Sequence, residues 1–461
     1  MGVKSVRLLV LASLVVLTCF ASSGEAGGPG TWTRISDPSG RNTDEVGVAR
    51  TADGVLHVAW QRRSGNTEGL VHTSIGANGL PGAVTQIVSG WASANYPDLV
   101  AMPDGTLRAF FGGIRSTNAG ETNNSLNTAT APGTGTPWTL QEGKAAASTV
   151  VYPSQVAAAL AGGGTPIVVW NDSCPGCNGF HFGTTPGTPD FKYETRGCCA
   201  YEANAAVDAT TGEVVVAWYS NVTNNNGVYS EAVSPGGPSG NVLLAPGSAS
   251  ADRKDALAPT GKVGVTGRIG APGIYLAYGQ GYPTYKSIAV WRHGSSKPVF
   301  TIAASSARHI DIAHAPGGRL WVMWERGGRF FATRTNQAAT RPGAIVSTAP
   351  PAGTSSIWRL TGEGSNGPLD LLAHVSTPSS LATWHTQLLP GLLLGVRAGR
   401  TSTLTVTDAG DPVAGATIAV GKRRATTNAR GVASLKLAKG RYTVRATRAG
   451  YVAASAKLRV R

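Results

Sequence analysis

Residues 209–218 read Ala-Thr-Thr-Gly-Glu-Val-Val-Val-Ala-Trp, and this stretch decides the fold. A glycine suited to a tight turn precedes a β-branched run, and an aromatic residue closes the unit six residues after the glycine. Related units begin at Gly54, Gly105, Gly164, Gly273, Gly318 and Gly367. With Gly212 included, successive glycines are 51, 59, 48, 61, 45 and 49 residues apart. Repeats of this length, each built from short strands, are typical of a β-propeller.

The repeats predict an all-β chain whose residues 31–397 form the propeller. Seven units favour seven blades, and a six-bladed ring with an extended closure is the alternative because the unit at Gly367 is degraded. A strand at Trp32–Ile35 is placed to complete the last blade. We expect the repeated aromatic residues to pack in the core; they are Trp60, Phe111, Trp170, Trp218 and Trp324.

The first 26 residues have the features of a secretory signal peptide. Lys4 and Arg7 supply positive charge, Leu8–Phe20 is an apolar run, and Gly24-Glu-Ala26 offers a small-residue cleavage site. No other stretch is apolar enough to span a bilayer as a helix. The sequence therefore predicts an exported, extracellular monomer without an integral membrane segment, with attachment to the cell wall as a further option.

The pattern changes near residue 400. Thr403–Thr407 alternates strictly between apolar and polar residues, which predicts a sheet with one buried face. The runs Pro-Val-Ala-Gly-Ala-Thr (412–417), Thr-Asn-Ala-Arg-Gly (427–431), Gly-Arg-Tyr-Thr-Val (440–444) and Ala-Gly-Tyr (449–451) follow in order. This segment resembles the carboxypeptidase-regulatory-like (transthyretin-like) domains of exported bacterial enzymes. The resemblance implies a small β-sandwich over residues 400–461 that acts as a spacer or adhesion module.

Positive charge is concentrated in this C-terminal segment. Residues 400–461 hold 13 Lys and Arg against 2 acidic residues, whereas residues 27–399 hold 25 against 22. Long-range attraction favours an anionic glycan or cell-wall polymer as the partner of an exported basic domain; a solvated surface that aids solubility is the alternative. Nucleic acid is not expected, because no groove-reading motif and no interleaving of aromatic and basic residues is present.

Propeller geometry places the residues before each first strand, and those after each repeated aromatic, at one end of the ring, which we call the mouth. Carboxyl groups suited to glycoside hydrolysis are Asp172, Glu202 and Glu325, with Tyr201 as an alternative nucleophile. Guanidinium groups suited to binding a sugar carboxylate are Arg62, Arg115 and Arg326. Sugar stacking and hydroxyl recognition are expected of Tyr96, Tyr152 and Asn221. Packing between blades is the alternative role for the recurring tyrosines.

Four cysteines remain after removal of the signal peptide: Cys174, Cys177, Cys198 and Cys199. An even number in an exported protein predicts disulfides, and three connectivities are open. Both pairs are expected at the mouth, on the third and fourth blades. A zinc site with four thiolates is the alternative. No metal or other cofactor is otherwise predicted.

The repeat, its short blades and the export signal together resemble the sialidase-like propeller superfamily over residues 31–397. That superfamily includes glycoside hydrolases, polysaccharide lyases and inactive binding members. Its Asp-box, Ser-x-Asp-x-Gly-x-Thr-Trp, is absent here, and Pro103-Asp-Gly-Thr106 matches only the turn.

Three functions follow as hypotheses. The first is hydrolysis of an anionic glycan. The second is a lyase reaction in which His309 or a tyrosine acts as base beside a uronate neutralised by arginine. The third is non-catalytic binding of a glycan or a wall polymer.

Overall fold

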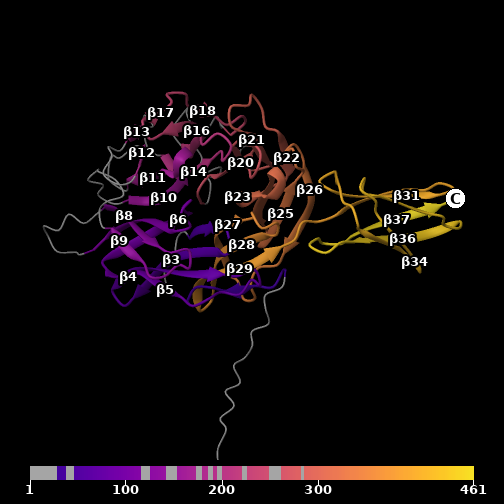
Figure 1. Cartoon of the computed structure of the whole chain (residues 1–461), viewed down its shortest axis with the longest axis horizontal. Coiled ribbons are helices and arrows are strands. Elements are labelled where there is room, and N and C mark those ends of the chain that lie inside the picture. Colours follow the sequence, from indigo (N-terminus) through magenta and orange to yellow (C-terminus); the bar gives the residue numbers. More distant parts are fainter. Residues whose placement is uncertain are drawn as a thin grey trace, which may run out of the picture.

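The computed structural model describes residues 29–37, 46–115, 125–141, 153–172, 179–184, 191–194, 200–220, 226–248, 261–281 and 285–461. Strands between residues 33 and 388 form seven sheets, and later strands form two more. Figure 1 shows the seven sheets gathered into one body, from which the two C-terminal sheets project. The chain is thus an all-β propeller followed by a small β-sandwich, which confirms the expected fold class.

The blades follow one another along the chain. Blade 1 consists of β2 (Gly47–Arg50), β3 (Leu56–Ser64), β4 (Thr67–Ile75) and β5 (Thr85–Trp91). Blade 2 consists of β6 (Ser93–Ala101), β7 (Leu107–Ile114), β8 (Ser125–Ala131) and β9 (Thr139–Gln141). Blade 3 consists of β10 (Pro153–Leu160), β11 (Pro166–Asp172), β12 (Gly179–Thr184) and β13 (Phe191–Glu194), with a 3-10 turn, η1 (Gly162–Gly164), after β10.

Blade 4 consists of β14 (Ala200–Val207), β15 (Val214–Ser220), β16 (Gly227–Ser234), β17 (Gly237–Pro238) and β18 (Leu243–Leu244). Blade 5 consists of β19 (Gly264–Thr266), β20 (Tyr275–Gln280), β21 (Ser287–Arg292) and β22 (Phe300–Ala303). Blade 6 consists of β23 (Arg308–Ala315), β24 (Arg319–Arg326), β25 (Arg329–Thr335) and β26 (Pro342–Thr348), with η3 (Pro316–Gly318) after β23. Blade 7 consists of β27 (Ser356–Glu363), β28 (Leu369–Thr377), β29 (Ser380–Leu388) and β1 (Thr33–Arg34).

The repeated unit forms the second strand of each blade. In blade 4 it is β15, which pairs with β14 on one side and β16 on the other, and all seven of its residues are buried. A strand covered on both faces needs a continuous apolar run, as the sequence has. The repeated aromatic residues of five blades are at most 2% exposed, which confirms their core role: Trp60, Phe111, Trp170, Trp218 and Trp324.

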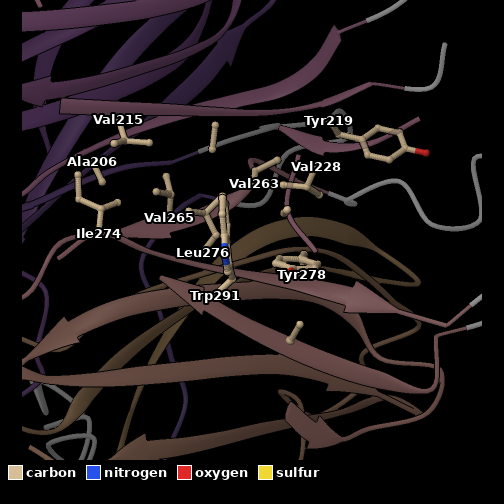
Figure 2. Packing of buried hydrophobic residues seen from close by; sticks show 13 residues of the cluster. Ala206, Val215, Tyr219, Val228, Val263, Val265, Ile274, Leu276, Tyr278 and Trp291 are labelled. Carbon is tan, nitrogen blue, oxygen red and sulfur yellow. The ribbon is translucent and has the colours of Figure 1, made fainter. Parts of the chain in front are cut away.

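Neighbouring blades share apolar cores. Between blades 4 and 5, side chains of β15 such as Val215 and Ala217 pack against Leu276 of β20 and Trp291 of β21. Figure 2 shows these side chains of the two blades meeting face to face. Because each blade buries apolar surface against the next, a blade depends on its neighbours for stability.

Two features link blade 7 to the start of the chain. Strand β1 pairs with β29, with Thr33 opposite His385 and Arg34 opposite Trp384, so the N-terminal strand completes the last blade as expected. Arg50 of blade 1 binds the carboxylates of Glu363 and Asp370 in blade 7 and donates to the carbonyl of Gly54 at 2.7 Å. We call this second feature the Arg50 lock.

Histidines complete the Arg50 lock. His314 Nε2 lies 3.2 Å from Glu363 Oε1, and His385 Nε2 lies 2.8 Å from Asp370 Oδ1. Burial alone would raise the pKa of Glu363, but the His314 hydrogen bond and the Arg50 charge lower it to about 2. The Glu363 carboxylate is therefore ionised at neutral pH.

The C-terminal sandwich contains two sheets around a common core. One has the order β30 (Leu393–Arg397), β31 (Ser402–Asp408) and β32 (Asp411–Pro412), with β35 (Val432–Leu435) also paired to β31. The other has the order β34 (Arg423–Thr426), β33 (Thr417–Val420), β36 (Gly440–Thr447) and β37 (Ala454–Val460). The first sheet includes β30, so the sandwich begins at Leu393 and not at residue 400, and the propeller ends with β29.

The sandwich is attached to blade 6 through buried ion pairs. Arg334 Nη2 lies 2.5 Å from Asp408 Oδ2, and Arg319 Nη2 lies 2.7 Å from Asp411 Oδ2. The Arg334 guanidinium also stacks on Trp321 and on Tyr451, whose ring centroids are 5.7 and 5.5 Å away. The side chain of Asp408 is only 2% exposed. Both acidic residues of the sandwich are thus used in its contact with the propeller.

In the described ranges, no helix has both the length and the apolar character needed to cross a membrane.

Candidate functional site

The first strands of all seven blades surround a central channel. A cavity of about 500 Å³ runs along it, and backbone and side chains of every blade line it. Its polar lining includes Arg50, Asp98, Asn204, Lys262, Asp311, Arg359 and Glu363. Arg50 and Glu363 belong to the end where the glycine turns lie, and the other five lie closer to the mouth, where the inner strands begin.

A left-handed residue interrupts the first strand of four blades near the mouth. Tyr96, Gln155, Glu202 and His309 have φ values of 50°, 52°, 54° and 48°. In each of these strands the pairing register shifts around that residue, so each is part of a β-bulge. Residues other than glycine adopt this backbone at a cost, and such strained bulges are frequent beside functional sites.

In three of these strands, an Asp or Asn stands two positions after the bulge residue and forms a hydrogen bond to the next blade. These residues are Asp98, Asn204 and Asp311. Asp98 Oδ2 accepts from the Ala158 N–H at 2.8 Å, Asn204 Nδ2 donates to the Val263 carbonyl at 3.0 Å, and Asp311 Oδ2 accepts from the Thr361 hydroxyl at 3.0 Å. The Oδ1 atom of each side chain accepts the N–H of the following residue in its own strand. These hydrogen bonds therefore hold the inner strands of neighbouring blades together just below the bulges.

Two ion pairs connect non-neighbouring blades across the channel. Lys262 of blade 5 lies 3.6 Å from Asp98 of blade 2, and Arg359 of blade 7 lies 3.7 Å from Glu202 of blade 4. Glu202 is also held through its backbone, whose N–H donates to Gln155 Oε1 at 2.8 Å. The Arg359 side chain is 29% exposed, so its guanidinium is accessible from the channel.

The acid–base properties of the channel depend on burial. Burial raises the pKa of Asp311 to about 6, although hydrogen bonds from Ile312 and Thr361 oppose the shift. Burial also raises the pKa of Asp98, against the opposing charge of Lys262. Burial and the positive charge of Arg359 lower the pKa of His374 to about 4. Near neutrality the channel therefore contains a carboxyl group that is partly protonated and a neutral imidazole.

An exposed tryptophan directly precedes Arg359 in the chain. Trp358 precedes Arg359 in β27, at a register shift between Ile357 and Arg359, and 46% of it is exposed. Its indole N–H donates to Ser376 Oγ at 3.2 Å, which fixes the ring from one side. An open indole face is a suitable surface for stacking a sugar ring. Arg359, the next residue in the chain, lines the channel and can bind a sugar carboxylate.

Three residues predicted for the mouth belong to this arrangement. Glu202 is 8% exposed and forms the ion pair with Arg359. Tyr96 and His309 are bulge residues at the same level of blades 2 and 6. Tyr96 also packs against the core between blades 2 and 3, in line with the alternative of packing between blades.

Other predicted residues lie at or just after the mouth ends of the second strands β3, β7 and β24, and have local partners. Glu325 Oε1 accepts the Gly328 N–H at 2.6 Å within the turn between β24 and β25. Arg326, at the same turn, lies over the Phe331 ring at 5.1 Å. Arg62 Nη2 lies 2.5 Å from Asp37 Oδ2. The Arg115 carbonyl accepts the Ala92 N–H at 3.3 Å, so its backbone joins the ends of β5 and β7. None of these four side chains is among the described residues that line the channel cavity.

The remaining predicted residues cannot be placed in full. Tyr152, Asn221 and the four cysteines lie outside the described residues, and both the disulfide and the zinc hypotheses stay predictions. Asp172 ends β11 opposite Pro153, and Tyr201 pairs with Tyr219. The side chains of Asp172 and Tyr201 are not among those that the structure describes. Within the described ranges, no group of three or more His, Cys, Asp or Glu is arranged to hold a metal ion.

Sequence reasoning missed Trp358, Arg359, Lys262, Asp98 and Asp311. Blade 7 carries the degraded repeat, so the start of β27 was not assigned to the mouth. For the two aspartates a signal exists: Tyr96-Pro-Asp98, Glu202-Ala-Asn204 and His309-Ile-Asp311 share an Asp or Asn two positions after the bulge. A comparison of the first strands, in addition to the second strands, would have shown this repeat.

A comparison with known protein families agrees with the C-terminal sandwich. Residues 403–461 match the family model described as the carboxypeptidase regulatory-like domain. No curated protein matches the chain in sequence.

Several solved structures are similar at low sequence identity. They include polysaccharide lyase Uly1 (TM-score 0.47, 9% identity, 77% of this chain and 91% of that chain). They also include an α-L-arabinanase from Penicillium chrysogenum (TM-score 0.41, 12% identity, 78% and 98%) and a sialidase from Trypanosoma rangeli (TM-score 0.40, 8% identity, 92% and 89%). These similarities concern the fold.

Proposed function

We propose that the protein is an exported, glycan-active propeller that hydrolyses an anionic glycan at the mouth of its channel. The observation that carries this proposal is the group formed by Trp358, Arg359 and Glu202. The exposed indole of Trp358 offers a stacking surface for a sugar ring. The next residue in β27, Arg359, can bind a sugar carboxylate, and the Glu202 carboxylate lies 3.7 Å from its guanidinium. Export rests on the signal peptide at residues 1–26.

The chemistry of hydrolysis requires one carboxyl group that carries a proton and one that does not. Asp311, with a pKa of about 6, is suited to donate a proton to the leaving glycosidic oxygen. Glu202 is suited to act at the sugar carbon, on the side opposite the leaving oxygen, either as the nucleophile or as the base that takes a proton from water. Water supplies the hydroxyl group that remains on the cleaved sugar.

A lyase reaction is the second candidate, and His309 favours it. This histidine has a strained backbone at the mouth, with a φ of 48°. In such a reaction Arg359 would neutralise a uronate carboxylate while a base removes the proton next to it. The product would then carry a new carbon–carbon double bond.

Product analysis on acidic polysaccharides tests the proposal. We expect the full-length protein to release new reducing ends without ultraviolet-absorbing products, and Asp311→Asn to lose most of this activity. Reducing ends accompanied by a new ultraviolet absorbance would instead identify the lyase. Retained binding without any product would contradict both reactions and leave a glycan-binding protein.

A further inference from the structure

The sheet β34-β33-β36-β37 of the sandwich has one buried and one exposed face. Ile418, Val444 and Leu458 point into the sandwich core. The alternate residues form the opposite face, which we call the basic face. Its cations are Arg424, Arg441, Arg445, Lys457 and Arg459, and its hydroxyl residues are Thr417, Thr426, Thr443, Thr447 and Ser455.

Strand register brings these cations close together. Arg441 lies directly opposite Arg459, and Lys457 lies opposite Thr443, to which its Nζ donates at 2.8 Å. Arg445 and Arg424 both flank Ala419, one on each neighbouring strand. Adjacent strands are about 4.8 Å apart and same-face residues of one strand about 7 Å apart. The Cα atoms of neighbouring cations on this face are therefore about 5 to 10 Å apart.

No acidic residue balances these cations from within the sandwich. Residues 400–461 contain only two carboxylate side chains, Asp408 and Asp411, and both bind arginines of blade 6. Like charges directly opposite each other destabilise a sheet, as Arg441 and Arg459 should. An anion that lies over both side chains would remove this repulsion.

Protection of sheet edges does not explain the pattern. Charged side chains on edge strands prevent unwanted strand pairing, and β34 and β37 are the edges of this sheet. Arg441 and Arg445, however, lie on the inner strand β36. Their position on an inner strand points to a ligand that covers the flat face of the sheet.

We propose that the basic face binds a linear acidic polysaccharide and so anchors the propeller to it. A polyanion is complementary to a face that carries five cations and no acidic residue, and the five hydroxyl side chains can bond to sugar hydroxyls. A lipid surface fits less well, because none of the large exposed apolar residues belongs to this face. Figure 1 shows the sandwich extending away from the propeller with the C-terminus at its far end, so a long polymer could reach it. This binding does not depend on the proposed reaction in the channel.

The test compares two triple variants of the full-length protein that lose the same charge. One is Arg441→Ser, Arg445→Ser, Arg459→Ser, on the basic face; the control is Arg430→Ser, Lys436→Ser, Lys439→Ser, at exposed positions outside it. Binding to polygalacturonate is measured at several salt concentrations. We expect the first variant to bind about tenfold more weakly or worse, with a shallower salt dependence, and the control to change little. The first variant should unfold at the same temperature as the wild type or higher.

Three results would overturn the proposal. Equal losses in both variants would mean that diffuse charge, and not this face, attracts the polymer. Binding to vesicles of anionic phospholipid but not to polygalacturonate would identify a membrane surface as the ligand. Unchanged binding in the basic-face variant would place the anchor elsewhere. The basic-face variant should cleave a short acidic oligosaccharide at the wild-type rate, which separates a failure here from a failure of the channel site.

Discussion

Trp358 has the largest side chain among the exposed apolar residues that the structure describes. Its indole is 46% exposed and has one side-chain hydrogen bond, to Ser376, beside the accessible Arg359. Trp358→Ala should reduce the affinity for an acidic oligosaccharide about tenfold, because the stacking surface is lost. Calorimetric titration measures this affinity, and the thermal midpoint should change by no more than about 2 °C.

The matched control for this prediction is Ile345→Ala on β26. Ile345 is also a large apolar residue, 51% exposed, but it lies on the outermost strand of blade 6. Its substitution should leave oligosaccharide affinity unchanged. If both substitutions weaken binding equally, or if Trp358→Ala has no effect, the indole is not part of the binding site.

Individual site residues could be predicted only in part. Glu202, Tyr96 and His309 could be assigned to the mouth because the repeat places them near the beginning of the inner strands, and the structure shows them as bulge residues within those strands. Arg359 and Lys262 were not, because each lies across the channel from the carboxylate that it binds, and no sequence spacing encodes that approach.

At the level of elements, the Arg50 lock joins blade 1 to blade 7. Arg50→Met removes a buried cation and leaves the carboxylates of Glu363 and Asp370 buried together. We expect the free energy of unfolding to fall by about 3–5 kcal/mol. Urea denaturation measures the change. Arg329→Met, at an exposed position on β25, is the control and should cost less than about 0.5 kcal/mol.

A loss below about 1 kcal/mol in Arg50→Met would mean that β1 and apolar packing close the ring without the lock.

The closure by β1 could be predicted from its position in the sequence. The lock could not, because Arg50 and Asp370 are far apart in the chain and belong to different repeats. The sequence predicts residues 393–397 as part of the propeller, whereas the structure pairs β30 with β31 of the sandwich. The runs that resemble the carboxypeptidase-regulatory-like domains begin only after β30.

Across the whole molecule, buried histidines make stability depend on pH. Burial lowers the pKa of His57 to about 4, of His72 to about 3 and of His374 to about 4. The unfolded chain takes up protons on these side chains below about pH 6.5, whereas the folded protein does not until pH 3–4. The free energy of unfolding should therefore fall as the pH drops from 7 to 4.

Other groups modify this dependence. The raised pKa of Asp311, about 6, favours the folded state at low pH and offsets part of the loss. The pKa of Glu363, about 2, causes a further loss of stability as the pH falls below about 4.5. Urea midpoints at pH 7, 5.5 and 4 should decrease in that order. A midpoint that is constant or rises toward pH 4 would contradict the protonation states assigned to the three histidines.

The central claim is that a glycan binds at the channel mouth between Trp358 and the Glu202–Arg359 pair. A crystal structure of the full-length protein with an acidic oligosaccharide tests it most directly. We predict a sugar ring stacked on the indole of Trp358, with its carboxylate bound to the Arg359 guanidinium. An oligosaccharide found only on the basic face of the sandwich, or no bound sugar in crystals grown with it in excess, would contradict this account.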